Sequence, residues 1–259
     1  MQFITRATAL LLALLALGSP LAANAQLEGL TRWSQTADRF ERLAIAATAR
    51  GAPPRASDPE VAAVLRSLTD REATFGGGPL NQEELLLASQ MIQRLPGLAN
   101  HYTEFAVQNL SAQARARQTD RNIITYQQEL VPMFTFMIDS MGVMVTSVDH
   151  MAGQADAAEF SEQQIGGMRQ VRNGVTQAAS GMILIAAAEG MTPEHRLALV
   201  TALERNAATF AAALTPSQRS SVVATAQRAR AQLGPQAREM LDRSIGLLSI
   251  RTCTRICAM

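Results

Sequence analysis

The chain has 259 residues, of which 47% are apolar and only 4% aromatic, enough for one domain with a substantial core or for two small ones. Every basic residue is arginine, which excludes a Schiff-base lysine, a phosphate-loop lysine and a Ser-x-x-Lys nucleophile pair. With 23 basic and 22 acidic residues, the chain has no long-range field to attract a polyanion, and we expect no nucleic-acid partner.

Residues 1–25 have the pattern of an export signal. Arg6 supplies a positive start, an apolar stretch follows, and the small-residue site Ala-Asn-Ala occupies 23–25. We expect cleavage after Ala25 and a product in the periplasm or the medium. The apolar stretch is too short to cross ~30 Å of hydrocarbon as a helix, so no transmembrane anchor is expected after processing. The abundance of Ala and Arg without Lys favours a GC-rich bacterial source.

Helix capping signals recur along the chain and predict an all-α fold. A capping side chain precedes a first-turn proline at Asp58–Pro59, Thr192–Pro193 and Thr215–Pro216. Capping-box spacing occurs from Asn81 to Glu84 and from Ser161 to Gln164. Because strand-like alternation is nearly absent, the sequence predicts an antiparallel helical bundle with helices at 27–49, 58–69, 81–94, 98–118, 120–152, 159–189, 193–213, 216–232 and 235–251.

Two Gly- and Pro-rich stretches, GAPPRAS and TFGGGPLNQ, separate an N-terminal part from the rest of the chain. The helices of residues 26–78 bury too little surface to stand alone. We therefore expect them to pack on the main helical bundle, residues 79–259, within one domain.

The segment 120–152 carries a continuous apolar stripe rich in methionine. Polar residues occupy its opposite side, where Thr135, Asp139, Thr146 and Asp149 are expected to face solvent. Because methionine fills irregular gaps in cores, the stripe predicts a buried helix face. Steps of four and three meet only apolar residues, namely Leu130, Phe134, Met137, Met141, Met144, Val148 and Met151.

The same stripe has a second interpretation as a soft-metal site. Thioether sulfurs select ions such as Cu(I) and Ag(I), and Met137, Met141 and Met144 are the candidate ligands; a haem role is the related alternative. His150 points about 100° away from the stripe at helical periodicity, which favours packing over ligation. A cavity for an apolar ligand is a third interpretation.

The next segment, 159–189, places Gly167, Gly174 and Gly181 at intervals of seven residues. Each glycine costs a helix interior ~1 kcal/mol relative to alanine, so three in register indicate a compensating close contact. We expect the long methionine side chains of 120–152 to lie against this glycine row. The two segments are therefore predicted to form a central helical hairpin, about 120–189.

The stretches MTPEHRLALVTALER and LTPSQRSSVVATAQR form an internal repeat of a helix and its cap. Within the second copy, LTPSQ at 214–218 resembles the Leu-Thr-x-x-Gln motif of small periplasmic stress chaperones and metal sensors built from helical hairpins. The resemblance covers five of 259 residues, and the first copy departs from the motif at both Leu and Gln. It implies a helical periplasmic protein with a chaperone-like function.

The two cysteines, Cys253 and Cys257, are separated by three residues. Oxidation is expected in an exported protein, either as a local disulfide or as a bridge between molecules, with free or metal-bound thiols as the remaining alternative. A c-type haem would need Cys-x-x-Cys-His, which does not occur.

The remaining polar residues form no catalytic motif that we recognise. His101 with Glu104 is the sole His and carboxylate pair on one helical face, and carboxylate-bridged metal bundles need more ligands. We expect no catalytic residues and no cofactor. The sequence predicts an exported, non-catalytic protein that binds an envelope protein or a small apolar ligand. Its alternatives are a soft-metal or haem protein, a stress-chaperone-like protein, and a hydrolase with a site assembled from scattered Asp, Glu and His.

Overall fold

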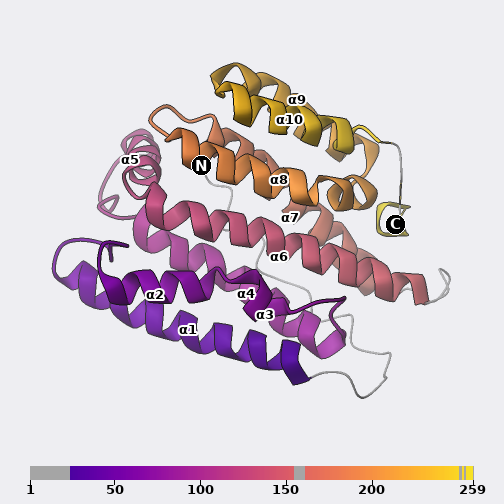
Figure 1. Cartoon of the computed structure of the whole chain (residues 1–259), viewed down its shortest axis with the longest axis horizontal. Helices are drawn as coiled ribbons and strands as arrows, with labels where there is room; N and C mark the ends of the chain where they lie inside the picture. The colour runs from indigo at the N-terminus through magenta and orange to yellow at the C-terminus, as the bar shows by residue number, and fades with distance from the viewer. Residues whose placement is uncertain (1–23, 155–160, 251–252, 254, 259) are drawn as a thin grey trace.

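A computed structural model provides the structure of the chain and describes residues 24–154, 161–250, 253 and 255–258 (Figure 1). In this part of the chain, helices are connected by short turns and no strand is present. The predicted all-α helical bundle is confirmed. The predicted export signal lies almost wholly outside the described residues.

The helices differ in length from four to 28 residues. The predicted helix 193–213 has the predicted bounds, whereas the short third and last helices were not predicted. In chain order the helices are α1 (Asn24–Ala49), α2 (Pro59–Leu68), α3 (Arg71–Phe75), α4 (Gln82–Thr103), α5 (Ala112–Thr125), α6 (Gln127–Gln154), α7 (Glu162–Ala186), α8 (Pro193–Ala213), α9 (Pro216–Ala229), the 3-10 turn η2 (Arg230–Gln232), α10 (Pro235–Leu248) and α11 (Arg255–Ala258).

Helices α6 and α8 form the central pair of the molecule. Figure 1 shows α1 to α4 below α6, α8 above it, and α9 with α10 along the top. Helix α6 packs on α4 at one side and on α8 at the other, and α8 packs in turn on α10 and α7. Helix α1 packs on α2, α3 and α4. Every long helix therefore has a neighbour for its apolar face.

The long consecutive helices α6 and α7 correspond to the predicted hairpin, with their connection at 155–160 outside the described residues. Helix α7 touches α6 but packs more extensively on α9 and α8. The predicted nesting of methionines against the glycine row is wrong for Gly174 and Gly181. A Cβ atom added at either glycine would have no described neighbour within 4 Å outside its own helix.

Helix α4 continues through Pro96, so the predicted break at 95–97 is wrong. Proline removes one helical hydrogen bond and crowds the preceding turn, but Leu95, Leu98 and Ala99 are buried. Their burial holds the helix together across the proline. Packing in the bundle therefore overrides a local helix breaker.

The chain breaks instead between α4 and α5, so the predicted helix 98–118 is wrong. Ala106 and Asn109 have φ values of 57° and 66°, in the left-handed region that ends regular helices. Ser111 then caps α5 by accepting a hydrogen bond from Ala114 N–H at 3.4 Å. A second break at Tyr126 separates α5 from α6, so the predicted start of a long helix at 120 is wrong as well.

The predicted caps are present at the helix starts that the sequence indicates. Reciprocal capping boxes join Asn81 with Glu84 and Ser161 with Gln164. Asp58, Thr192 and Thr215 each cap a helix whose first turn contains proline. These caps satisfy backbone donors that would otherwise have no partner in the first turn.

Each copy of the repeat at the starts of α8 and α9 contains an arginine that caps the C-terminus of the preceding helix. Arg196 and Arg219 each donate to a carbonyl eight residues upstream, those of Ala188 and Ala211, at 2.8 and 2.6 Å. These carbonyls lie where α7 and α8 end, so each arginine satisfies the C-terminus of the preceding helix. At the start of α10, Arg238 donates to a carbonyl five residues upstream.

One hydrophobic cluster extends from α1 to α11 and includes side chains on both sides of the predicted boundary near residue 78. Trp33 on α1 stacks on Phe136 of α6 with ring centroids 6.4 Å apart. Its indole N–H donates to the carbonyl of Leu68 at 2.9 Å. The N-terminal helices thus share their core with the rest of the chain, while the exact domain division stays a prediction.

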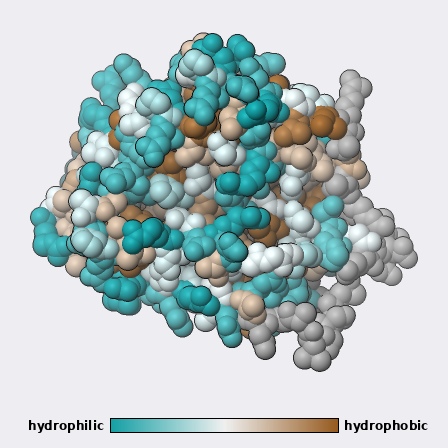
Figure 2. Space-filling view, viewed as in Figure 1, coloured by the Kyte–Doolittle hydropathy of each residue, from teal (hydrophilic) through white to brown (hydrophobic). Residues whose placement is uncertain are grey.

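Among the described residues, α6 is the one helix long and apolar enough to cross a membrane by length and composition, but 67% of its most apolar window is buried in the bundle. This burial is typical of a central core helix. Figure 2 shows apolar residues scattered in small patches among hydrophilic ones on the face in view. Large exposed apolar side chains occur on separate segments, namely Ile45, Leu110, Leu184 and Ile250.

Candidate functional site

The seam between α6 and α8 contains a buried polar network. Asp139 of α6 is only 7% exposed, and Arg205 of α8 donates from Nε and Nη2 to its two oxygens at 3.0 and 2.7 Å. Asn206 donates from Nδ2 to Asp139 Oδ1 at 2.7 Å. The expectation that Asp139 faces solvent is wrong, because a second helix covers that side of α6 and supplies the compensating arginine.

Gly142 lets α6 and α8 approach closely beside this network. A Cβ added at Gly142 would lie 2.8 Å from Cγ of Asn206 and closer still to its Oδ1. Asn206 is fixed there by its bonds to Asp139 and to the carbonyl of Ala202. A close glycine contact therefore lies on the methionine-rich helix itself, where the sequence pattern gave no sign of it.

A shallow, open groove of about 380 Å³ lies next to the network. Its floor has apolar side chains, two threonines add hydroxyl groups, and Glu194 and Arg205 add opposite charges. Two of the guanidinium nitrogens of Arg205 are engaged by Asp139, so the orientation of this cation is fixed. The groove is lined by Thr135 of α6 and by Glu194, Leu197, Ala198, Thr201 and Arg205 of α8.

The three candidate metal ligands lie at different depths. Met144 is buried at 4% exposure, whereas Met137 and Met141 are partly buried and pack against the core. Met137 also lines a gap of about 10 Å³ with Pro96 and Met133, among others. In the α4/α6 seam, two methionines thus line the same small gap as the helix-internal proline. The soft-metal role stays a prediction.

The histidines lie on three different helices. His101 of α4 is half-buried against the ring of Phe40, with centroids 6.2 Å apart. Burial lowers the pKa of His101, and the negative charge of Glu41 opposes this shift. Its predicted companion Glu104 is exposed. Among the described residues, no group of three His, Cys, Asp or Glu side chains is arranged to hold a metal ion.

A buried carboxylate near the start of α6 escaped the sequence analysis. Glu129 is fully buried. Its Oε1 accepts a hydrogen bond from Ala56 N–H at 2.8 Å and forms an ion pair with Nε of Arg55 at 3.3 Å. The guanidinium of Arg55 also lies 4.9 Å from the ring centroid of Tyr126. Burial and the charge of Glu129 raise the pKa of the neighbouring Tyr102. This cluster ties the loop after α1 to α6.

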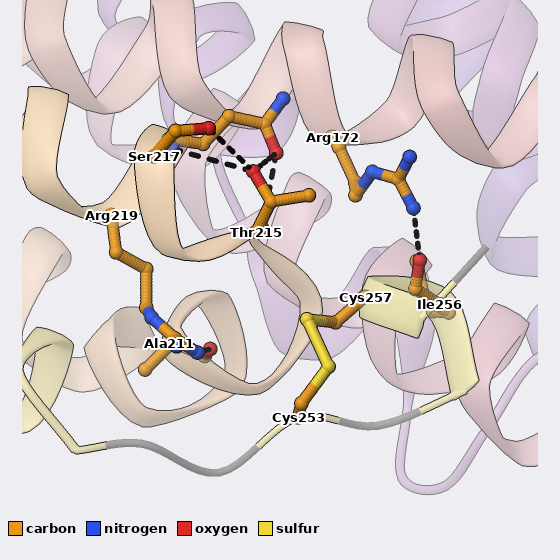
Figure 3. The surroundings of a disulfide bond; sticks show 9 residues. Arg172, Ala211, Thr215, Ser217, Arg219, Cys253, Ile256 and Cys257 are labelled. Carbon is orange, nitrogen blue, oxygen red and sulfur yellow. Dashed lines mark hydrogen bonds between the residues drawn. A yellow bond between two sulfur atoms is a disulfide. The ribbon is translucent and has the colours of Figure 1, made fainter.

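Cys253 and Cys257 pair with each other, which confirms the local disulfide among the alternatives (Figure 3). The bridge closes on α11, whose Ile256 and Cys257 are buried. Arg172 of α7 donates from Nη1 to the carbonyl of Ile256. Sequence spacing predicted the bridge but gave no sign that this segment packs into the body of the molecule.

The motif LTPSQ serves as a helix cap in this structure. Leu214 is fully buried, and Thr215 and Gln218 form a capping box at the start of α9. The Gln218 amide also donates to Asn173 of α7 at 2.9 Å. Comparison of the chain with protein-family models, with curated proteins and with solved structures finds no match.

Proposed function

We propose that this chain is an exported bacterial protein without catalytic activity that binds a segment of another polypeptide in the groove between α6 and α8. The observation that carries the proposal is the composition of that groove. Leu197 and Ala198 offer an apolar floor, while Glu194 and Arg205 offer charges of both signs. A polypeptide segment presents matching apolar side chains, carbonyl groups and amide groups.

The shape of the groove favours a polypeptide over a small apolar ligand. Sites for small molecules enclose most of the ligand surface, whereas this groove is largely open to solvent. The gap beside Met137 measures about 10 Å³, roughly the space that a single water needs. Of the two partner classes expected from the sequence, the protein partner is therefore the better supported.

Two features of the described residues are compatible with export. A disulfide at Cys253 and Cys257 is compatible with an oxidising compartment. The amide of Gln26 donates to the carbonyls of Gly77 and Gly78 at 3.2 and 3.4 Å. Cleavage after Ala25 would leave this anchoring residue at the start of the mature chain. N-terminal sequencing of the protein from a periplasmic fraction tests this, and an intact residue 1 would contradict it.

The groove proposal is tested by selecting peptides from a random display library on the purified protein. The affinity of a selected peptide is then measured by calorimetry for the wild type, Ala198→Phe and Ala208→Phe. The first variant fills the groove, and the second adds the same ring at an exposed position of the same helix. We expect Ala198→Phe to weaken binding about tenfold or more, and Ala208→Phe to leave it unchanged.

Two outcomes would contradict the groove proposal. One is a library that yields no binder under oxidising conditions. The other is a selected peptide that binds both variants equally well, since its site would then lie elsewhere. Circular dichroism of the two variants verifies that each retains the helical fold.

A further inference from the structure

Arg172 of α7 is a buried cation without a carboxylate partner among the described residues. Its side chain is only 6% exposed, and Nη1 donates to the backbone carbonyl of Ile256. The Nε of Arg172 has no hydrogen-bond partner in the described part of the chain. Buried arginines are normally paired with acidic groups, whereas no acidic side chain of the described residues compensates the charge of Arg172.

Arg196 of α8, which also binds carbonyls, satisfies more of its donors than Arg172 does. Arg196 donates from Nε, Nη1 and Nη2 to three different carbonyls at 2.9, 2.7 and 2.8 Å. Arg196 is also partly exposed, so solvent reaches its charge. Arg172 combines deeper burial with fewer bonds. A ligand with a negative charge would therefore gain more at Arg172 than the neutral carbonyl now in place.

The carbonyl that Arg172 binds belongs to Ile256 of α11, a short segment that packs into the body of the molecule as a bound peptide would. The side chain of Ile256 is fully buried, and α11 packs on α6 and α8. Helix α11 has only four residues, too few for a helix that is stable by itself. The disulfide between Cys253 and Cys257 closes this short turn and so favours its bound conformation (Figure 3).

We propose that the site at Arg172, now filled by Ile256, binds the C-terminus of another polypeptide that ends in an apolar residue, and that reduction of the Cys253–Cys257 disulfide opens this site. The apolar side chain of the ligand replaces that of Ile256. Its terminal carboxylate replaces the carbonyl at Arg172 and pairs with the guanidinium. This site lies beside Arg172 of α7, where α11 now packs on α6 and α8, and Arg172 is not among the residues that line the groove of the proposed function.

The opening step is a thiol–disulfide exchange with a dithiol reductant. Cys253 is exposed whereas Cys257 is buried, so a thiolate of the reductant attacks the sulfur of Cys253. A mixed disulfide forms, and the sulfur of Cys257 leaves with the electron pair and takes up a proton. The second thiol of the reductant then displaces Cys253, which leaves as a thiol. The dithiol becomes a disulfide and both cysteines are reduced.

The test uses the tripeptide Thr-Arg-Ile, labelled at its amino end, with either a free carboxylate or a C-terminal amide. Fluorescence anisotropy measures binding to the full chain before and after treatment with dithiothreitol. We expect the acid to bind only the reduced protein and the amide to bind it about tenfold more weakly. The double variant Cys253→Ser/Cys257→Ser should bind the acid without reductant.

Two substitutions on α7 separate the site from general charge effects. Arg172→Met removes the buried cation with little change in volume and should abolish the preference for the acid. Arg169→Met removes an exposed arginine of the same helix and should leave binding unchanged. If Arg172→Met fails to fold, as judged by circular dichroism, the difference in affinity between the acid and the amide for the reduced wild type still tests the proposal.

Three outcomes would overturn the proposal. They are equal binding of the acid to oxidised and reduced protein, equal affinity of the acid and the amide, and absence of binding by both the reduced protein and the folded serine variant. None of these outcomes affects the groove between α6 and α8, whose test uses the oxidised protein.

Discussion

At the scale of single residues, Asp139 places a carboxylate in the α6/α8 seam and depends on Arg205 to compensate its charge. Asp139→Asn keeps the shape but loses the paired charge, and it leaves Arg205 facing a neutral amide. We expect a loss of ~2 kcal/mol in the free energy of unfolding, measured by urea denaturation. Asp242→Asn is the matched control, because Asp242 forms the same two-bond pair with Arg230 at the surface. Asp242→Asn should lower the free energy of unfolding much less. Equal losses would show that the Asp139–Arg205 pair contributes no more to stability than an exposed pair.

Two helical glycines allow a matched test of the α6/α8 contact. An alanine at Gly142 must push Asn206 aside, so Gly142→Ala should destabilise the protein by ~1–3 kcal/mol despite its better helix propensity. Gly174→Ala places its methyl group in open space and should stabilise the protein by ~1 kcal/mol. Thermal unfolding of both variants gives the signs. A stabilising Gly142→Ala would mean that the two helices are farther apart than described here.

His101 makes the stability depend on pH in a known direction. Its pKa in the folded protein lies below the ordinary 6.5 because burial disfavours the imidazolium, so the unfolded chain binds the proton more tightly. The neutral imidazole contributes stability above pH 6.5, and this contribution is lost as the pH falls through the lowered folded-state pKa. We expect His101→Gln to flatten the fall in unfolding free energy below pH 6.5.

At the scale of helices, capping chemistry was sufficient to locate five starts, those of α2, α4, α7, α8 and α9. Thr192 with Pro193 and Thr215 with Pro216 mark the first residues of α8 and α9 because side-chain caps act within one turn. The break predicted at Pro96 is wrong for the opposite reason. Whether a helix survives an internal proline depends on the neighbours that bury its flanking residues, and these neighbours are distant in sequence.

The methionine stripe of α6 is an element whose role can be decided by substitution. The triple variant Met137→Leu/Met141→Leu/Met144→Leu preserves apolar volume and removes all three sulfur atoms. If the stripe serves packing, the variant should unfold within ~1.5 kcal/mol of the wild type, and silver titration of both proteins should show no stoichiometric binding. Stoichiometric binding by the wild type that the variant lacks would favour the soft-metal alternative.

At the scale of the whole molecule, the sequence predicted the helical class but not which helices meet. Periodicity indicates that a helix has an apolar face, and it cannot identify the helix that covers this face. For α6, a neighbour in sequence was expected to supply the cover, whereas α8 supplies the largest share and α4 the next largest. The candidate groove was missed for the same reason, since Thr135 lies on one helix and Leu197 on the other.

The buried clusters of Glu129 and Arg172 also arise only at this scale. Each joins a polar side chain on a central helix to the backbone of a segment far away in the chain, at Ala56 and at Ile256. Neither pairing leaves a local pattern in the sequence. A charged residue within an apolar stretch is the one signal that was available, and it does not identify the partner.

The central claim is that a polypeptide segment binds between α6 and α8, and the structure of the protein with a selected peptide tests it most directly. We predict that the peptide lies along the groove, with an apolar side chain against Leu197 and Ala198 and a polar group near Arg205. A peptide bound on any other face of the molecule, with the groove empty, would contradict the account.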